Sequence, residues 1–361
     1  MLFRSGVTIR SILAHQSGII SDYYGPGFMP LPSWKEQDER PYADLDRLVS
    51  ETALCQESYT ISSYSNVGFA LLGLVVEKVS GRKFNDYVRE TILLPAGMKD
   101  SGFTYRPELD KRYARGQRGK NWVDIMGIPD SPAGALASSA REMGAFMQAI
   151  LKTHAERLDS TQGGIMRKET LEAMWTQENT ATKLDFGTLQ MLAWYGIEAR
   201  DGTGRQYYGH GGDIPGFHAM LMVDPETDLG VTLMVNSDAM DSIALIEAGR
   251  ELLHIWAAAA RGVEVGADDS ALPAAAGAEP VKTAIPDEVQ KSFLAGNWAS
   301  PLGLFCINKR GASVFLDFMG VPLELLSVGP DRYVAKAKLL YFIPVSHPLI
   351  DTLSIRAYSV D

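Results

Sequence analysis

The 361-residue chain is 46% hydrophobic and 22% charged and has a net charge of −10, a composition typical of soluble globular proteins. Its length is sufficient for a sizeable core and predicts two domains. Dispersed lysines and arginines exclude the basic footprint of a nucleic-acid-binding protein, and no apolar run reaches the roughly 18 residues of a membrane span. Two lone cysteines, Cys55 and Cys306, indicate neither a disulfide framework nor a metal site.

The first half of the sequence is predicted to be mainly helical. They are expected at 7–15, Val67 to Val79, Phe84 to Leu94, about 140–151 and Met166 to Trp175. The helix from Val67 carries apolar residues on most faces, which predicts that it is buried, and Ser80-Gly81 ends it with a glycine stop. Ser139 followed by Glu142 has the spacing of a capping box at the start of the fourth helix.

The hydrophobic period changes to two after residue 205. Apolar residues alternate from Phe217 to Val223 and again from Val231 to Val235, with a turn at Asp224-Pro225-Glu226-Thr227-Asp228 between them. This pattern predicts an antiparallel hairpin. The amphipathic stretch Ile243 to Ala259 predicts a long helix that covers the sheet.

The last hundred residues differ in composition. Residues 262–286 are rich in Ala, Gly, Pro and acidic residues and contain no aromatic residue, which predicts a linker. Short β-like runs follow at 303–307, 313–318 and 339–343. We therefore expect a main domain at 1–260, a linker at 261–288 and a small, possibly incomplete all-β domain at 289–361.

The first candidate site motif is Tyr64-Ser65-Asn66, directly before the Val67 helix. A phenol acts as a general base only when it is ionised, and its unperturbed pKa is about 10. Lowering that pKa to about 7 requires roughly 4 kcal/mol of favourable environment, for which a nearby lysine is the usual source. The Asn66 amide is suited to bind a substrate carbonyl or a neighbouring side chain. Taken alone, the motif is more often an ordinary turn before a helix.

The second candidate motif is His210-Gly211-Gly212-Asp213. Adjacent glycines let a substrate backbone approach a strand closely, and amides there can point at a developing oxyanion. His210 is suited to donate a hydrogen bond or a positive charge to a substrate. The alternative is a glycine-rich turn with an exposed histidine.

Together, these motifs resemble those of the penicillin-recognising serine hydrolases, which include class C β-lactamases, DD-peptidases, D-aminopeptidases and related esterases. The resemblance covers roughly residues 5–258. Five blocks carry it, in the family's order: Val7 to Gly18, Tyr64-Ser65-Asn66, Leu94 to Ser101, Ala133 to Met143, and His210-Gly211-Gly212, which stands where other members have Lys-Thr-Gly.

The resemblance implies an α+β, β-lactamase/transpeptidase-like fold, with an antiparallel sheet flanked by helices and a helical subdomain. It implies acyl transfer through a serine, with Tyr64 shuttling the proton, Asn66 positioning the substrate and His210 taking the place of the third-motif lysine. Gly211 and Gly212 would bring the substrate close, and the Asp213 amide would supply an oxyanion-hole donor. No metal or cofactor is implied. Peptides with D-residues or small esters are favoured over β-lactams, and the periplasm or cell envelope over the cytoplasm.

The serine and lysine of such enzymes come from a Ser-x-x-Lys helix turn that precedes the Tyr-x-Asn motif. The chain has one such string, Ser80-Gly81-Arg82-Lys83, but it follows that motif and lies at a predicted helix stop. We therefore expect it to be structural, and the chain to be a serine hydrolase whose nucleophile region lies upstream of Met1.

Two consequences follow from that expectation. The chain alone is predicted to be inactive and poorly stable, since losing four or five buried side chains at about 1.5–3 kcal/mol each rivals the whole stability of a typical domain. The alternative is a non-catalytic relative that binds or regulates. The family-like state of Tyr64, Asn66 and His210 favours the hydrolase.

Overall fold

The computed structural model describes residues 6–21, 33–36, 57–128, 130–156, 164–182, 188–240 and 242–263, together with the backbone of seven strands between 296 and 356. Its centre is a five-stranded antiparallel sheet with the order β3-β4-β5-β6-β7. The strands are β3 (Leu189–Gln190), β4 (Tyr195–Glu198), β5 (Gln206–Ile214), β6 (Phe217–Asp224) and β7 (Leu229–Val235).

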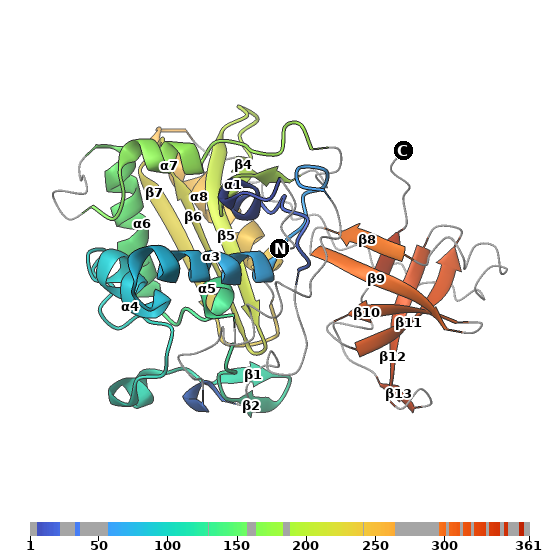
Figure 1. Cartoon of the computed structure of the whole chain (residues 1–361). Helices are drawn as coiled ribbons and strands as arrows, with labels where there is room; N and C mark the ends of the chain where they lie inside the picture. Colours follow the sequence, from blue (N-terminus) through green and yellow to red (C-terminus); the bar gives the residue numbers. More distant parts are fainter. Residues whose placement is uncertain are drawn as a thin grey trace.

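Each face of this sheet has its own hydrophobic core. Successive side chains of a strand point to opposite faces. Met220 and Met222 of β6 pack with Leu245 and Leu253 of α8 (Ser242–Ala260), which covers one face. Val223 packs in a second core beneath the helices α6 (Ala140–His154) and α7 (Lys168–Met174). Figure 1 shows the sheet between these layers.

The predicted hairpin and its covering helix are both confirmed. β6 and β7 pair through the Asp224-to-Leu229 turn in the expected antiparallel register. The helix α8 begins and ends within one residue of the predicted bounds. The strand β5, which carries the His210 motif, pairs with β6 across Pro215-Gly216, so the sheet extends further than the hairpin that the alternation predicts.

A helical region and a small hairpin complete the described main part of the chain (Figure 1). Its elements are α1 (Ile9–Leu13), the 3-10 turns Trp34–Glu36 and Pro107–Arg112, α3 (Asn66–Ser80), α4 (Phe84–Val88), the π-helical turn Arg89–Leu93, α5 (Ser131–Gly134), β1 (Gly116–Arg118) and β2 (Asn121–Val123). The sequence patterning predicts α3, the helix from Phe84 and the segment of α1 but contains no signal for β1 and β2.

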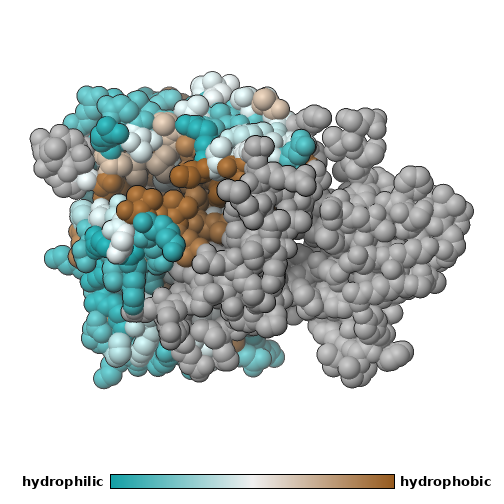
Figure 2. Space-filling model, in the orientation of Figure 1, coloured by the Kyte–Doolittle hydropathy of each residue, from teal (hydrophilic) through white to brown (hydrophobic). Residues whose placement is uncertain are grey.

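The prediction that the Val67 helix is buried on most faces is wrong. α3 spans Asn66–Ser80 and ends at Gly81 with φ 68°, as the glycine stop predicts. Val67 and Ala70 are buried, but Val79 is 83% exposed. Figure 2 shows apolar surface along this part of the molecule. α3 contacts α1, α4 and α5, and these contacts leave apolar residues near its C-terminal end exposed.

Only half of the predicted capping box forms. Ser139 is the N-cap of α6, and its hydroxyl accepts the Glu142 backbone N–H at 3.3 Å. The Glu142 carboxylate instead accepts the Asp100 N–H at 2.9 Å and the Ser101 hydroxyl at 2.5 Å. The Glu142 carboxylate therefore links α6 to the loop after Pro95.

The strands of the C-terminal region pair with one another in a second antiparallel sheet. They are β8 (Gly296–Ser300), β9 (Gly303–Arg310), β10 (Ser313–Phe318), β11 (Val321–Gly329), β12 (Arg332–Leu339), β13 (Ile343–Val345) and β14 (Ser354–Arg356). Two of the predicted runs coincide with β9 and β10. The third falls partly outside the described residues, as do most residues of the predicted linker. Within the described part of the chain, no helix is long and apolar enough to cross a membrane.

Candidate active site

Tyr64 lies in the loop that leads into α3, and its neighbour Ser65 fixes that loop. The Ser65 hydroxyl caps α3 by accepting the Gly68 N–H at 2.9 Å and donates to the Ile20 carbonyl at 2.6 Å. A side chain at Gly68 would meet Ile12 at 2.9 Å, so α1 contacts the start of α3 closely. Asn66 is the first residue of α3 and is partly buried. The local sequence thus places the motif at a rigid helix start.

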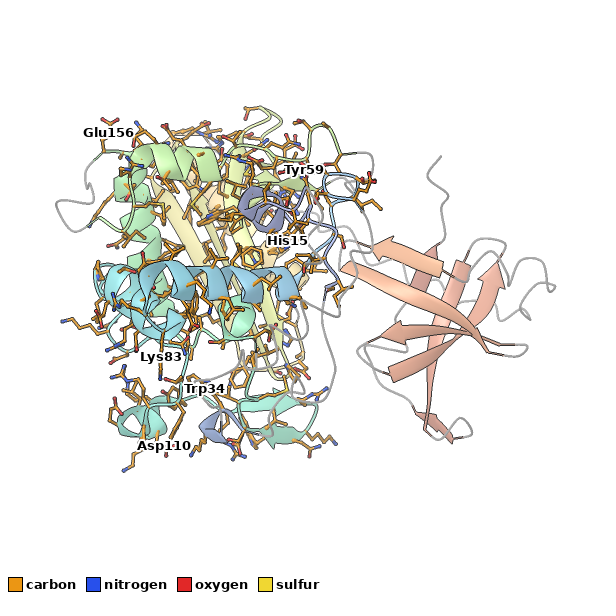
Figure 3. All side chains as sticks on the ribbon, in the orientation of Figure 1. His15, Trp34, Tyr59, Lys83, Asp110 and Glu156 are labelled. Carbon is orange, nitrogen blue, oxygen red and sulfur yellow. The ribbon has the colours of Figure 1, made fainter. Side chains whose placement is uncertain are left out.

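His15, which sequence reasoning missed, supports this loop from behind. It is only 2% exposed, and its Nδ1 accepts the Ser65 N–H at 3.1 Å. Its carbonyl accepts the Ser63 N–H at 2.7 Å, and its ring centre lies 4.3 Å from that of Tyr64. Burial, with a smaller effect of His210, lowers the pKa of His15 to about 3. His15 is therefore a neutral hydrogen-bond acceptor at neutral pH (Figure 3).

His210 lies in the middle of β5, beside the Tyr64 loop. Its ring centre is 6.3 Å from that of Tyr64 and 5.2 Å from that of Tyr195 on β4. Its Nδ1 lies 2.5 Å from the Gly211 carbonyl oxygen, and because a carbonyl only accepts, Nδ1 carries the hydrogen. Burial lowers the pKa of His210. Its Nε2 is then a hydrogen-bond acceptor, and the ring is uncharged at neutral pH.

Tyr195 is a second residue that sequence reasoning missed. Burial, with a smaller contribution from Tyr64, raises the pKa of Tyr195, so this phenol stays protonated at neutral pH. Only its place at the end of the short strand β4 brings it to His210. The sequence around Tyr195 contains no pattern that predicts its contact with His210.

The motif half of β5 has an uncovered edge, meaning an edge with which no described strand pairs. β4 pairs with β5 only from Gln206 to Gly209, and no other described strand continues along that edge. Pro215-Gly216 closes the hairpin between Ile214 and Phe217. Because backbone groups alternate in an antiparallel ladder, Gly211 and Asp213 direct their N–H and C=O groups away from β6, toward the uncovered edge. A substrate backbone can bind there as an added strand.

The two glycines of the motif differ in their surroundings. A Cβ on Gly211 would lie 2.9 Å from the Ser242 Cβ and 3.2 Å from Ile246, at the start of α8. A Cβ on Gly212 would meet no described atom within 4 Å. The lack of a side chain at Gly211 therefore allows α8 to pack closely against β5. The lack of a side chain at Gly212 leaves space on the opposite face of the strand, which also carries the His210 side chain.

Asp213 directs its carboxylate to the α8 side of the sheet. Its Oδ1 accepts the Ser242 N–H at 2.9 Å, and its Oδ2 accepts the Ser242 hydroxyl. The same Oδ1 lies 2.5 Å from Nδ1 of His218. The Asp213 side chain is thus held on the α8 side of the sheet, while its backbone N–H points toward the uncovered edge of β5.

The Ser-x-x-Lys string of this chain does not form a turn of one helix. Ser80 ends α3, Gly81 is left-handed at φ 68°, and Lys83 precedes the first residue of α4. The Ser80 hydroxyl accepts the Arg82 N–H at 3.2 Å. α3 has 15 residues, so this string lies about 22 Å from the Tyr64 end of the helix. Figure 3 shows Lys83 and His15 at opposite ends of α3.

A family model described as "Beta-lactamase" matches residues 3–254. The chain belongs to the β-lactamase family. Its curated relatives include Beta-lactamase-like protein 2 of Dictyostelium discoideum, 34% identical over 43% of this chain and 28% of the relative. Penicillin-binding protein 4 of Amycolatopsis lactamdurans is 26% identical over 68% of this chain and 64% of the relative. The matched segments span 28%, 25% and 64% of the first three relatives.

Solved structures show the same fold. The crystal structure of SurE matches with a TM-score of 0.55 at 22% identity, over 95% of this chain and 74% of that one. D-amino acid amidase from Ochrobactrum anthropi SV3 matches with a TM-score of 0.52 at 23% identity, over 70% of this chain and 71% of the other. The fold is thus β-lactamase/transpeptidase-like and α+β, as the motifs predict.

Proposed function

We propose that the site performs acyl transfer on small esters or on peptides with D-residues, through an acyl-enzyme. The observation that carries the proposal is the meeting of two distant motifs at one uncovered strand edge. The rings of Tyr64 and His210 lie 6.3 Å apart there, and the Asp213 amide points outward from the same strand.

The mechanism assigns one step to each group. A serine hydroxyl attacks the substrate carbonyl while ionised Tyr64 takes its proton. The Asp213 N–H, with the amide of the serine itself, stabilises the oxyanion. Tyr64 then gives the proton to the leaving group, and a water repeats the sequence to release the acid. Asn66 orients the substrate amide.

The charge of the site supports the choice of substrate. An uncharged His210, with Nε2 as an acceptor, offers no positive charge to a substrate carboxylate. It does suit an amine or hydroxyl donor. The ordering of D-residue peptides and esters before β-lactams rests on the resemblance of the histidine motif to that of esterase-like and D-aminopeptidase-like members, and an uncharged His210 is compatible with it. One structural relative, the D-amino acid amidase from Ochrobactrum anthropi SV3, agrees with this ordering.

We also propose that Tyr64 works with a Ser-x-x-Lys that residues 1–361 do not supply. The geometry of Ser80 and Lys83 supports this, because these two residues lie on different helices. The C-terminal strands are proposed to form the separate β-domain at 289–361, in support of which β8 to β14 pair only with one another.

The test begins with the DNA upstream of the Met1 codon, which is searched for an in-frame Ser-x-x-Lys. The encoded protein is then assayed with D-alanyl p-nitroanilide, p-nitrophenyl butyrate and nitrocefin. Tyr64→Phe is expected to lower kcat/KM at least 100-fold, the usual contribution of a general base. Tyr59→Phe is the matched control, because Tyr59 lies in the same segment and bonds the exposed Thr8 hydroxyl at 3.1 Å.

Each outcome has a meaning. Ester or D-peptide turnover that requires Tyr64 supports the proposal. Dominant nitrocefin turnover overturns the substrate ordering. A stop codon before Met1, together with no turnover, identifies a non-catalytic relative, and the same residues then form a binding pocket.

A further inference from the structure

His218 lies between two carboxylates at the closed end of the β5–β6 hairpin. Its Nδ1 is 2.5 Å from Oδ1 of Asp213, and its Nε2 is 3.2 Å from Oδ1 of Asp238. Carboxylates only accept hydrogen bonds, so both ring nitrogens must carry a hydrogen for both contacts to form. The geometry therefore fits an imidazolium, whose side chain is only 10% exposed.

The first end of this bridge is attached to α8. The Asp213 carboxylate also accepts the backbone N–H and the hydroxyl of Ser242, the first residue of α8. Asp213 and His218 are direct partners across β5 and β6. The bridge thus joins two strands and a helix at the residue whose amide is directed to the uncovered edge.

The second end is attached to the hairpin turn and to β1. Asp238 accepts the Gly216 N–H at 2.5 Å and the Arg118 Nε–H at 2.8 Å. Burial opposes ionisation of Asp238, but these bonds and that of His218 outweigh it and lower the pKa of Asp238. Main-chain bonds between Gln117 and residues 236 and 238 hold β1 in place.

Protonation of His218 places a positive charge between the two carboxylates of this cluster. Two carboxylates, Asp213 and Asp238, then face two cations, His218 and Arg118. A neutral His218 would leave one carboxylate contact without a hydrogen. Charge-assisted hydrogen bonds are about twice as strong as neutral ones.

We propose that His218, as an imidazolium between Asp213 and Asp238, is a positioning residue that fixes the Asp213 amide at the substrate edge of β5. This role rests on the proposed function, because it assigns that amide to the oxyanion. The bridge acts from the opposite face of the sheet and touches no substrate. A shift of β5 by a fraction of an ångström would misplace the amide, to which transition-state stabilisation is sensitive.

The test uses the protein in the form that its gene encodes. Nitrogen-15 NMR of the histidine rings at pH 7 is expected to show a ring with both nitrogens protonated whose signal vanishes in His218→Gln. Amide exchange is then measured by mass spectrometry. A peptide over 211–218 should exchange about tenfold faster in His218→Gln, which corresponds to ~1.4 kcal/mol, while 219–235 stays unchanged. His154→Gln, on α6 near Trp175, is the matched control.

The last measurement compares kcat and KM of the wild type and His218→Gln. His218→Gln should lower kcat about tenfold with little change in KM, since a misplaced oxyanion donor affects the transition state. A neutral His218, unchanged exchange, or acceleration spread over the whole sheet overturns the bridge. Normal kcat with fast local exchange overturns the positioning role. If the wild type hydrolyses nothing, the proposed function fails, and the bridge is judged by the spectrum and the exchange.

Discussion

Two adjacent glycines offer a matched pair of substitutions. Gly211→Ala and Gly212→Ala make the same chemical change at neighbouring positions of β5, and neither glycine has a positive φ. Differences in strand propensity therefore nearly cancel. What differs is the space around the new methyl group, which meets Ser242 at 2.9 Å in the first variant and no described atom within 4 Å in the second.

The contacts set the size of the effect. At Gly211 three atoms of Ser242 and Ile246 lie 2.9–3.2 Å from the added Cβ, and overpacking of this kind costs about 1–3 kcal/mol. With a melting-temperature change of about 2–4 °C per kcal/mol in a domain of this size, a 2 kcal/mol loss lowers the melting temperature by about 4–8 °C. Gly212→Ala should stay within about 0.5 kcal/mol of the wild type.

The assay is urea unfolding followed by circular dichroism, together with ester hydrolysis by the encoded enzyme. Gly211→Ala should lose stability. Gly212→Ala should keep stability but lose at least tenfold in kcat/KM, because its methyl group enters the space on the face that His210 shares, next to the edge at which the substrate backbone is proposed to bind. Equal stability losses in the two variants would refute the assigned orientation of the strand.

Three further predictions follow from the described contacts. His15→Ala should cost about 2–4 kcal/mol in urea unfolding, because it leaves the Ser65 N–H unpaired and opens a cavity, whereas His15→Asn, which keeps an acceptor, should recover part of that loss. The pKa of His15 is lowered from 6.5 to about 3, so the unfolded state binds more protons than the folded state below pH 6.5. The free energy of unfolding should therefore be constant above pH 6.5 and fall by about 2 kcal/mol by pH 5. A profile that is flat, or that is equally steep in His15→Asn, would contradict this. Ser80→Ala and Lys83→Met should leave hydrolysis within twofold of the wild type, and a hundredfold loss in either would restore this pair as nucleophile and base.

Sequence patterns correctly predicted the elements whose structure depends on residues close together in the chain. The glycine stop at Gly81, the alternation in β6 and β7 and the amphipathic α8 depend on residues close in sequence, and all three form as expected. The candidate residues Tyr64 and His210 could also be selected from the sequence, because five motif blocks in order resemble those of a known family, although each motif alone favours an ordinary turn. That the two rings lie side by side is a fact of the fold alone.

The remaining features depend on contacts between distant segments. Glu142 bonds Asp100 and Ser101 instead of its own helix cap, and a capping pattern contains no information about that loop. His15 lacks any local mark of function, yet burial against Tyr64 determines its protonation state. Val79 is apolar but 83% exposed, since hydrophobic periodicity indicates which face can be buried and not what covers it.

The electrostatics of the two faces of β5 explain what the site still requires. On the substrate face His15 and His210 are neutral, because burial lowers the pKa of each, and Tyr195 is protonated because burial raises its pKa. On the other face His218 contacts the Asp213 carboxylate, and Arg118 pairs with the Asp238 carboxylate. None of these groups provides the roughly 4 kcal/mol that ionises a phenol at pH 7. The proposed mechanism therefore requires a cation close enough to Tyr64 to lower the pKa of its phenol.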